Sequence, residues 1–143
     1  MRSRLALLVV TLAALAMPAA ALSAQEVLVP PFLNYEQPKV RPHEILLSED
    51  GTLVLYGIKY QSYGGPVAEA TGRGYTRGCV PDCAQGKVYR PRAKIRLSRV
   101  TWCEARPIYA RLRYSLKGPI PKGLKRHAIY DLRPVDEHGK PIC

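Results

Sequence analysis

Apolar and polar residues alternate in a series of short runs along this chain, and this period of two most constrains its fold. Alternation is typical of β-strands with one buried face, whereas an amphipathic helix repeats about every 3.6 residues, a spacing that no apolar stripe here sustains. Strands are expected near residues 44–48, 52–60, 67–77, 86–90, 93–100 and 108–116, with a seventh through Ala128, Tyr130 and Leu132. The pattern predicts an all-β fold, a small antiparallel sandwich or a partly open barrel of six to seven strands, stapled by disulfides.

Asp50 and Gly51 separate the first two of these runs and predict a hairpin. Asp-Gly between two β-rich runs is a strong hairpin signal, because the turn needs a positive φ that glycine adopts without steric cost. Strands are therefore expected on either side of this turn, at 44–48 and 52–60.

One face of the expected 67–77 strand consists of small residues, Ala68, Ala70, Gly72 and Gly74. Such a face leaves room for a bulky neighbour against the backbone, and the candidates are Tyr56, Tyr60 and Trp102. A phosphate-cradling glycine loop is the alternative, but no helix follows that would supply a dipole. The structural interpretation is therefore favoured.

The first 24 residues have the pattern of a secretory signal peptide. Arg2 and Arg4 precede an uncharged run over 5–17, and small residues follow Pro18. A transmembrane anchor is the alternative, but the run is shorter than the roughly 20 residues that span a bilayer. Cleavage is expected after one of residues 21–24, so the mature protein is expected to be secreted, extracellular and without a transmembrane segment.

The expected domain organisation follows from these patterns. The signal peptide at 1–24 precedes an extended Pro-rich arm at 25–43, which shows no sustained period. A β domain at 44–116 and a basic C-terminal extension at 117–143 complete the chain. This length suits one domain with a modest core, which disulfides would stabilise.

The four cysteines, Cys79, Cys83, Cys103 and Cys143, are expected to form two disulfides in an oxidising compartment, with three possible connectivities. Two of them lie in the segment 79–83, which could hold a metal, shuttle electrons or close a structural ring. A metal would need two further ligands, and His127, His138 and Cys143 lack the spacing of zinc sites. Redox chemistry favours Cys-x-x-Cys at a helix N-terminus, which is absent here. We expect a structural staple, with no metal and no cofactor.

The motifs around this loop resemble a known group. The segment 56–64, the spaced small residues at 68–74 and the loop Cys79-Val80-Pro81-Asp82-Cys83-Ala84-Gln85-Gly86 are similar to uncharacterised small secreted proteins of actinobacterial type. Their pattern is Gly-Leu-x-Trp-x-x-Trp-Gly, then Cys-x-Pro-x-Cys-Ala-x-Gly; this chain carries Tyr60 and Tyr63 in place of the tryptophans. The resemblance covers about residues 45–116 and implies a shared fold and secretion, but no activity. Because members often carry only the loop cysteines, it implies the bridges Cys79–Cys83 and Cys103–Cys143.

Positive charge is concentrated in the second half of the chain. The formal net charge is +11, and between Arg73 and Arg126 there are 15 basic residues and only two acids, Asp82 and Glu104. The period of two assigns many of these cations to the polar faces of the expected strands. A density of this kind attracts anionic partners.

Four of these cations are predicted to share one solvent-facing surface: Lys94, Arg96, Arg111 and Arg113. The apolar positions of the 93–100 and 108–116 strands would face a common core, and Tyr109 would accompany the arginines. Like charges on neighbouring strands disfavour folding unless water or a counter-charge screens them. The surface is either simply solvated or it binds an anionic partner.

The leading hypothesis is a secreted, non-enzymatic β domain that binds anionic envelope or extracellular material through this surface and the basic tail. The expected partner is an anionic cell-wall polymer, an acidic polysaccharide or an anionic lipid surface; no motif for specific nucleic-acid binding is present. The alternative is an inhibitor or protein-interaction module that presents the Cys79 to Cys83 loop. A rigid loop can enter a groove at low entropic cost.

An enzyme is not expected. The three histidines, His43, His127 and His138, lie outside any recognised Ser/His/Asp or Cys/His context. Glu44, Glu69 and Glu104 would form a carboxylate pair only by accident of folding. Trp102, beside Cys103, is expected to pack in the core against a disulfide rather than to serve as a ligand platform.

Overall fold

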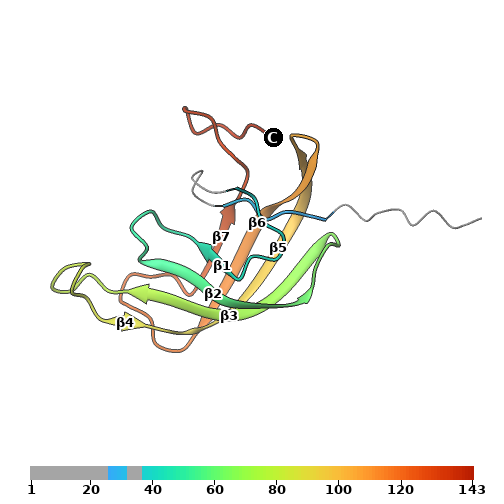
Figure 1. Cartoon of the computed structure of the whole chain (residues 1–143). Helices are drawn as coiled ribbons and strands as arrows, with labels where there is room; N and C mark the ends of the chain where they lie inside the picture. The colour runs from blue at the N-terminus through green and yellow to red at the C-terminus, as the bar shows by residue number, and fades with distance from the viewer. Residues whose placement is uncertain (1–25, 32–36) are drawn as a thin grey trace, which may run out of the picture.

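The computed structural model describes residues 26–31 and 37–143, which form a curved antiparallel sheet shaped as a half-barrel (Figure 1). Its strands are β1 (Glu44–Leu46), β2 (Leu53–Ser62), β3 (Val67–Arg77), β4 (Val88–Tyr89), β5 (Arg92–Cys103), β6 (Arg106–Lys117) and β7 (His127–Asp131). The order across the sheet is β1-β2-β3-β5-β6-β7, and β4 pairs with β3 beyond the start of β5. The described residues contain no helix, and the predicted all-β fold is confirmed.

The strands follow the predicted alternation closely. β2 extends two residues beyond Tyr60, because Ser62 still pairs with Glu69 of β3. The strand expected at 86–90 shortens to the two residues of β4, and β7 forms where the seventh strand was predicted. The predicted signal peptide at 1–24 lies outside the described residues, as does part of the predicted arm.

The predicted hairpin forms between β1 and β2, with Ile45 opposite Leu55. Gly51 has a φ of 67°, and its N–H donates to the carbonyl of Ser48 at 3.2 Å. Asp50 accepts the N–H of Thr52 at 3.0 Å and the Thr52 hydroxyl at 2.7 Å. These hydrogen bonds, led by the Thr52 hydroxyl, lower the pKa of Asp50 and fix the turn.

The core lies on one face of the curved sheet. Its completely buried centre includes Leu55 of β2, Leu97 of β5 and Leu112 of β6. The segment preceding the first strand covers part of this core: Val27 and Val29 are buried in it. Backbone hydrogen bonds at 2.9 Å join the residue between them, Leu28, to the start of β6. The opposite face of the sheet is left to solvent.

The small-residue face of β3 admits close neighbours, and at its two glycines the nearest side chains are not aromatic. A Cβ at Gly72 would lie 2.9 Å from the carbonyl oxygen of Tyr56 and 3.5 Å from Ile58. At Gly74 it would lie 3.2 Å from Leu116 and 3.3 Å from Pro91. Of the predicted aromatic neighbours, Tyr60 does lie against this face, because it pairs with Ala70 and packs against the core.

The prediction that Trp102 packs in the core is wrong, because its exposed fraction is 62%. Trp102 lies near the end of β5, opposite Pro107, where the β5–β6 hairpin extends past the other strands (Figure 1). Adjacency to Cys103 was the basis of the prediction. A disulfide at the tip of a projecting hairpin does not bring its neighbours into the core.

Tyr109 was expected beside the arginines of β6, and this is also wrong: it is completely buried. Its hydroxyl donates to the carbonyl of Gly65 at 2.9 Å and accepts the N–H of Gly64 at 3.0 Å. Burial raises the pKa of this tyrosine. Tyr109 and Leu112 both enter the core although they are three positions apart, so the alternation changes between them. The positive φ of Arg99, 58°, occurs on β5 at this point of the ladder.

Candidate anion-binding site

The outward face of the sheet carries polar side chains whose positions follow from the strand register. Arg96 of β5 lies directly opposite Arg113 of β6, and on its other side it faces Glu69 of β3. The guanidinium of Arg96 and the carboxylate of Glu69 form an ion pair at 2.7 Å. The structure thus places the two predicted arginines together, and one of them has an acidic partner.

The other two predicted residues flank this pair on the same outward face. Lys94 occupies the next outward position along β5, opposite Ser115. Arg111 is half-buried and lines a hollow of about 420 Å³ with Arg99, Arg133 and Asp131. The hydrogen bonds from Arg133 lower the pKa of Asp131, so this hollow contains a carboxylate as well as cations. The four predicted residues therefore share the outward face, but Lys94 and Arg111 line two different hollows on it.

A more basic hollow, of about 600 Å³, opens on the outward face across β2, β3, β5 and β6. Its rim carries five cations, which we call the basic groove: Lys59, Arg73, Arg92, Lys94 and Lys117. The remaining lining residues are Gly57, Thr71, Gly72, Ala93 and Ser115, and no carboxylate is among them. Of the predicted site residues, only Lys94 lies here.

A bulge at a glycine of β2 contributes to the hollow. Gly57 has a φ of 60°, and the register of β2 against β3 shifts between Tyr56 and Lys59. A bulge of this kind bends a strand and increases its local twist. Gly57 is exposed and has no side chain, so the long side chains around it project beyond it. Gly72 and Ala93 occupy inward positions of their strands and therefore add no side chain to this face.

The electrostatics of the basic groove are one-sided. Arg73 lies directly opposite Arg92, which in turn lies opposite Lys117. Within residues 26–31 and 37–143, none of the five cations forms an ion pair. The nearby acid on β3, Glu69, is engaged by Arg96. The groove therefore holds five uncompensated positive charges.

Two hydroxyl groups lie among these cations. Thr71 Oγ1 accepts a hydrogen bond from the side-chain amide of Gln61 at 3.0 Å. Because that bond uses an acceptor site, the Thr71 hydroxyl hydrogen is free to be donated to a ligand. Ser115, in the same row of the sheet, offers a second hydroxyl. The groove thus contains cationic and hydroxyl hydrogen-bond donors, and its lining contains no carboxylate.

Sequence reasoning missed four of these residues, Lys59, Arg73, Arg92 and Lys117. The alternation did place Arg73 on the polar face of its strand, and this was the signal that could have found it. The sequence did not indicate which strands pair with one another. β3 pairs with β5 along most of its length, with only two residues pairing to the intervening β4, so Arg73 and Arg92 meet.

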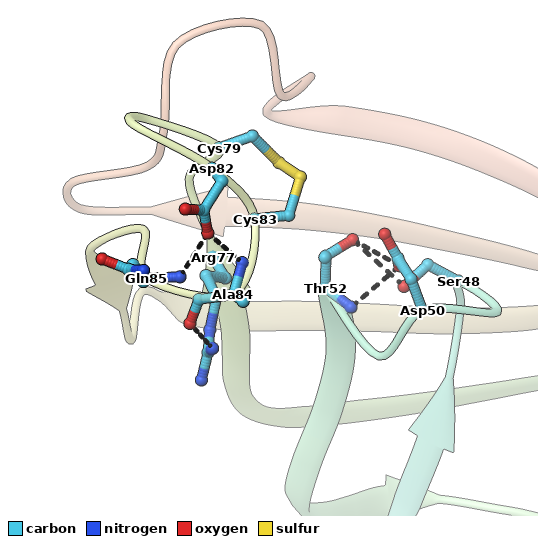
Figure 2. The surroundings of a disulfide bond; sticks show 9 residues. All are labelled: Ser48, Asp50, Thr52, Arg77, Cys79, Asp82, Cys83, Ala84 and Gln85. Atoms are coloured by element: carbon cyan, nitrogen blue, oxygen red, sulfur yellow. Dashed lines mark hydrogen bonds between the residues drawn. A yellow bond between two sulfur atoms is a disulfide. The ribbon is translucent and has the colours of Figure 1, made fainter.

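The disulfide loop forms a separate feature at one end of the sheet (Figure 2). Both pairings implied by the resemblance are confirmed, Cys79 with Cys83 and Cys103 with Cys143. Asp82 Oδ1 accepts the N–H groups of Ala84 and Gln85, both at 2.8 Å, and the Arg77 guanidinium donates to the Ala84 carbonyl. The loop is held firmly against the chain, beside the β1–β2 turn (Figure 2).

Residues 26–31 and 37–143 contain no group of three or more His, Cys, Asp or Glu side chains that could hold a metal ion. In the same ranges no helix is long and apolar enough to cross a membrane. The two disulfides indicate an oxidising compartment of the extracellular type.

No protein-family model matches the chain, and comparisons with curated proteins and with solved structures find no match either. The resemblance of the cysteine loop to small secreted actinobacterial-type proteins therefore stays a prediction.

Proposed function

We propose that this protein is a secreted, non-enzymatic β domain that binds anionic envelope or extracellular polymers through the basic groove and the outward face around it. The observation that carries this proposal is the run of opposed cations, Arg73, Arg92 and Lys117, on three adjacent strands without a carboxylate among them. The Arg96–Arg113 pair extends the same face.

The energetic cost of this arrangement supports a binding role. Like charges directly opposite on neighbouring strands are destabilising, each pair by a few tenths of a kcal/mol. A polyanion in the groove would replace this repulsion with attraction. The hollow shape adds to the effect, because a concave site lined by one sign of charge concentrates the field on a ligand of the opposite sign.

Secretion is the second part of the proposal. It is supported by the pattern of residues 1–24 and by the oxidising compartment that the two disulfides indicate. An acidic polysaccharide or a cell-wall polymer is the anionic material that a secreted protein meets in that location.

The third part of the proposal is that the protein is not an enzyme. All four cysteines are bonded in disulfides, so none offers a thiolate nucleophile. The histidines are exposed at the surface, and the basic groove contains no carboxylate that would act as a general base. Binding requires only the cations and hydroxyl donors that the groove contains.

A charge-reversal experiment tests the proposal. The variant Arg73→Glu/Arg92→Glu should lose retention on an anionic polymer matrix, because it turns the centre of the groove from attractive to repulsive. Lys122→Glu/Lys140→Glu makes the same change in net charge at exposed positions outside the groove and should largely keep retention. Arg96→Glu/Arg113→Glu should have an intermediate effect, since Glu69 already compensates Arg96. Equal loss in the groove variant and in the Lys122/Lys140 control would contradict a defined binding face.

One observation favours the alternative, an inhibitor or protein-interaction module. Val80, within the disulfide loop, has an exposed fraction of 84%, while Asp82 and Arg77 hold the loop backbone. An apolar side chain on a rigid, exposed loop suits insertion into a partner's groove. Such binding would depend on Val80 and be insensitive to substitutions at Arg73 and Arg92.

A further inference from the structure

The basic groove divides into two rows that cross the sheet. The first row contains Arg73, Arg92 and Lys117, each opposite the next. The second row contains Lys59, Thr71, Lys94 and Ser115, paired in the same way. In each row, cations from different strands therefore surround one place on the sheet surface where an anionic group could bind.

The spacing of a β-sheet sets the distances between these positions. Adjacent strands lie about 4.8 Å apart, so the side chains of one row can converge on a single anionic group. Residues two apart on a strand, such as Arg92 and Lys94, are separated by about 6.7 Å. The groove thus offers two anion positions about 6.7 Å apart, one in each row.

The residue types of the first row favour a particular shape of anion. A guanidinium group donates through a planar fork, and the first row holds two such forks side by side. A carboxylate presents its two oxygens in one plane and satisfies one fork well. A tetrahedral phosphate or sulfate ester presents oxygens in more than one plane, so it can accept from Arg73, Arg92 and Lys117 at once.

The second row is suited to a similar group through different donors. Lys59 and Lys94 supply ammonium groups, and Thr71 and Ser115 supply hydroxyls. The engagement of Thr71 Oγ1 by Gln61 leaves the hydroxyl hydrogen for a ligand oxygen. Each row can therefore hold one anionic ester group of the same chain.

We infer that the basic groove binds two successive tetrahedral oxyanion esters, phosphate or sulfate, on a flexible carbohydrate or polyol polymer. This inference rests on the proposed function and specifies its ligand. Among the described residues, the lining of the groove contains no aromatic side chain. Tyr56 lies opposite Arg73 at the end of the first row, but a single ring does not provide the series of stacking positions on which single-stranded nucleic acids depend. No large apolar side chain lines it either, so it lacks the residues that insert into a lipid surface.

The test compares polymers of matched charge and length by titration with the full chain. The probes are poly(glycerol phosphate), dextran sulfate and polyglutamate. At least one of the two ester polymers should bind about tenfold or more tightly than polyglutamate, as expected when a charged hydrogen-bonding geometry is matched rather than missed. The tighter of the two identifies the ester. Equal affinity for polyglutamate and both ester polymers would overturn the inference.

A charge-preserving variant separates recognition by the arginine forks from attraction by charge alone. Arg73→Lys/Arg92→Lys keeps both positive charges but removes both forks, and it should weaken ester-polymer binding by about tenfold. Arg99→Lys/Arg106→Lys removes two exposed guanidinium groups outside the groove and should bind within about twofold of the wild type. Melting temperatures establish that both variants fold, and the single variants replace the double variant if it does not.

The outcomes distinguish the inference from the proposed function. If Arg73→Lys/Arg92→Lys binds like the wild type while the charge-reversed Arg73→Glu/Arg92→Glu does not, the proposed function stands and the ester assignment is wrong. If no anionic polymer binds, both are wrong. Tighter binding to an oligothymidylate or to phosphatidylglycerol vesicles than to either ester polymer would also overturn the inference.

Discussion

At the scale of single residues, the disulfide loop shows why a glycine follows its cysteines. A Cβ added at Gly86 would lie 1.5 Å from the carbonyl oxygen of Gly78 and 3.0 Å from that of Asp82. Both contacts are to backbone atoms, which cannot move aside as the end of a side chain could. Gly86 is buried, and the chain passes against Gly78 there because no side chain intervenes.

The substitution Gly86→Ala is therefore expected to destabilise the protein. Overpacking at a well-filled position typically costs about 1–3 kcal/mol, and here the backbone itself must shift. Gly65→Ala is the matched control, because its Cβ would meet only the carbonyl oxygen of Val67, at 3.9 Å. The control should change stability by no more than about 0.5 kcal/mol. Urea denaturation measures both; equal stabilities would show that the loop does not need this close approach.

At the scale of strands and loops, the two disulfides fasten very different lengths of chain. Cys79 and Cys83 are four residues apart, whereas Cys103 and Cys143 are 40 residues apart. The second bridge ties the end of the chain to the tip of the β5–β6 hairpin. β7 lies between the two cysteines in sequence and pairs with β6, so this bridge also encloses an edge strand of the sheet.

Removing the long bridge should cost more stability than removing the short one. The chain-entropy model gives about 3–4 kcal/mol for the loop closed by Cys103 and Cys143, and about 2 kcal/mol for the loop closed by Cys79 and Cys83. The variants Cys103→Ser/Cys143→Ser and Cys79→Ser/Cys83→Ser, compared by urea denaturation, test this order. A larger loss from the short bridge would mean that the loop stabilises the fold through its contacts rather than through chain entropy.

Local pattern was enough to predict the strands but not their partners. Alternation placed Lys94 and Arg96 correctly on the outward face, because each strand repeats every two residues. Sequence could not show that β3 pairs mainly with β5, and so the meeting of Arg73 with Arg92 was missed. Tyr109 was misplaced because the alternation breaks near it, and the local pattern carried no sign of that break.

At the scale of the whole molecule, the curved sheet has an apolar face that forms the core and a cationic face that is exposed to solvent. Figure 1 shows the curvature of the sheet. The core and the segment at 26–31 lie on its inner face, whereas the cations of the basic groove lie on its outward face. A strongly positive molecule attracts polyanions over a distance set by the Debye length, about 10 Å at 0.1 M salt and about 3 Å at 1 M. Binding through the basic groove should therefore depend steeply on salt, whereas insertion of the disulfide loop into a partner should not.

The steepness with which binding affinity falls as salt concentration rises can also be predicted. For a single-stranded phosphate polymer, the slope of log affinity against log salt is about −0.7 for each phosphate that the protein neutralises. Two phosphates in the basic groove, one in each row, would give a slope of about −1.4 for poly(glycerol phosphate). The variant Arg73→Gln/Arg92→Gln, which removes both arginines of the first row, should reduce its magnitude to about 0.7. Lys122→Gln/Lys140→Gln should leave it unchanged. Titrations at several salt concentrations measure each slope, and identical slopes for both variants would mean that the polymer does not enter the groove.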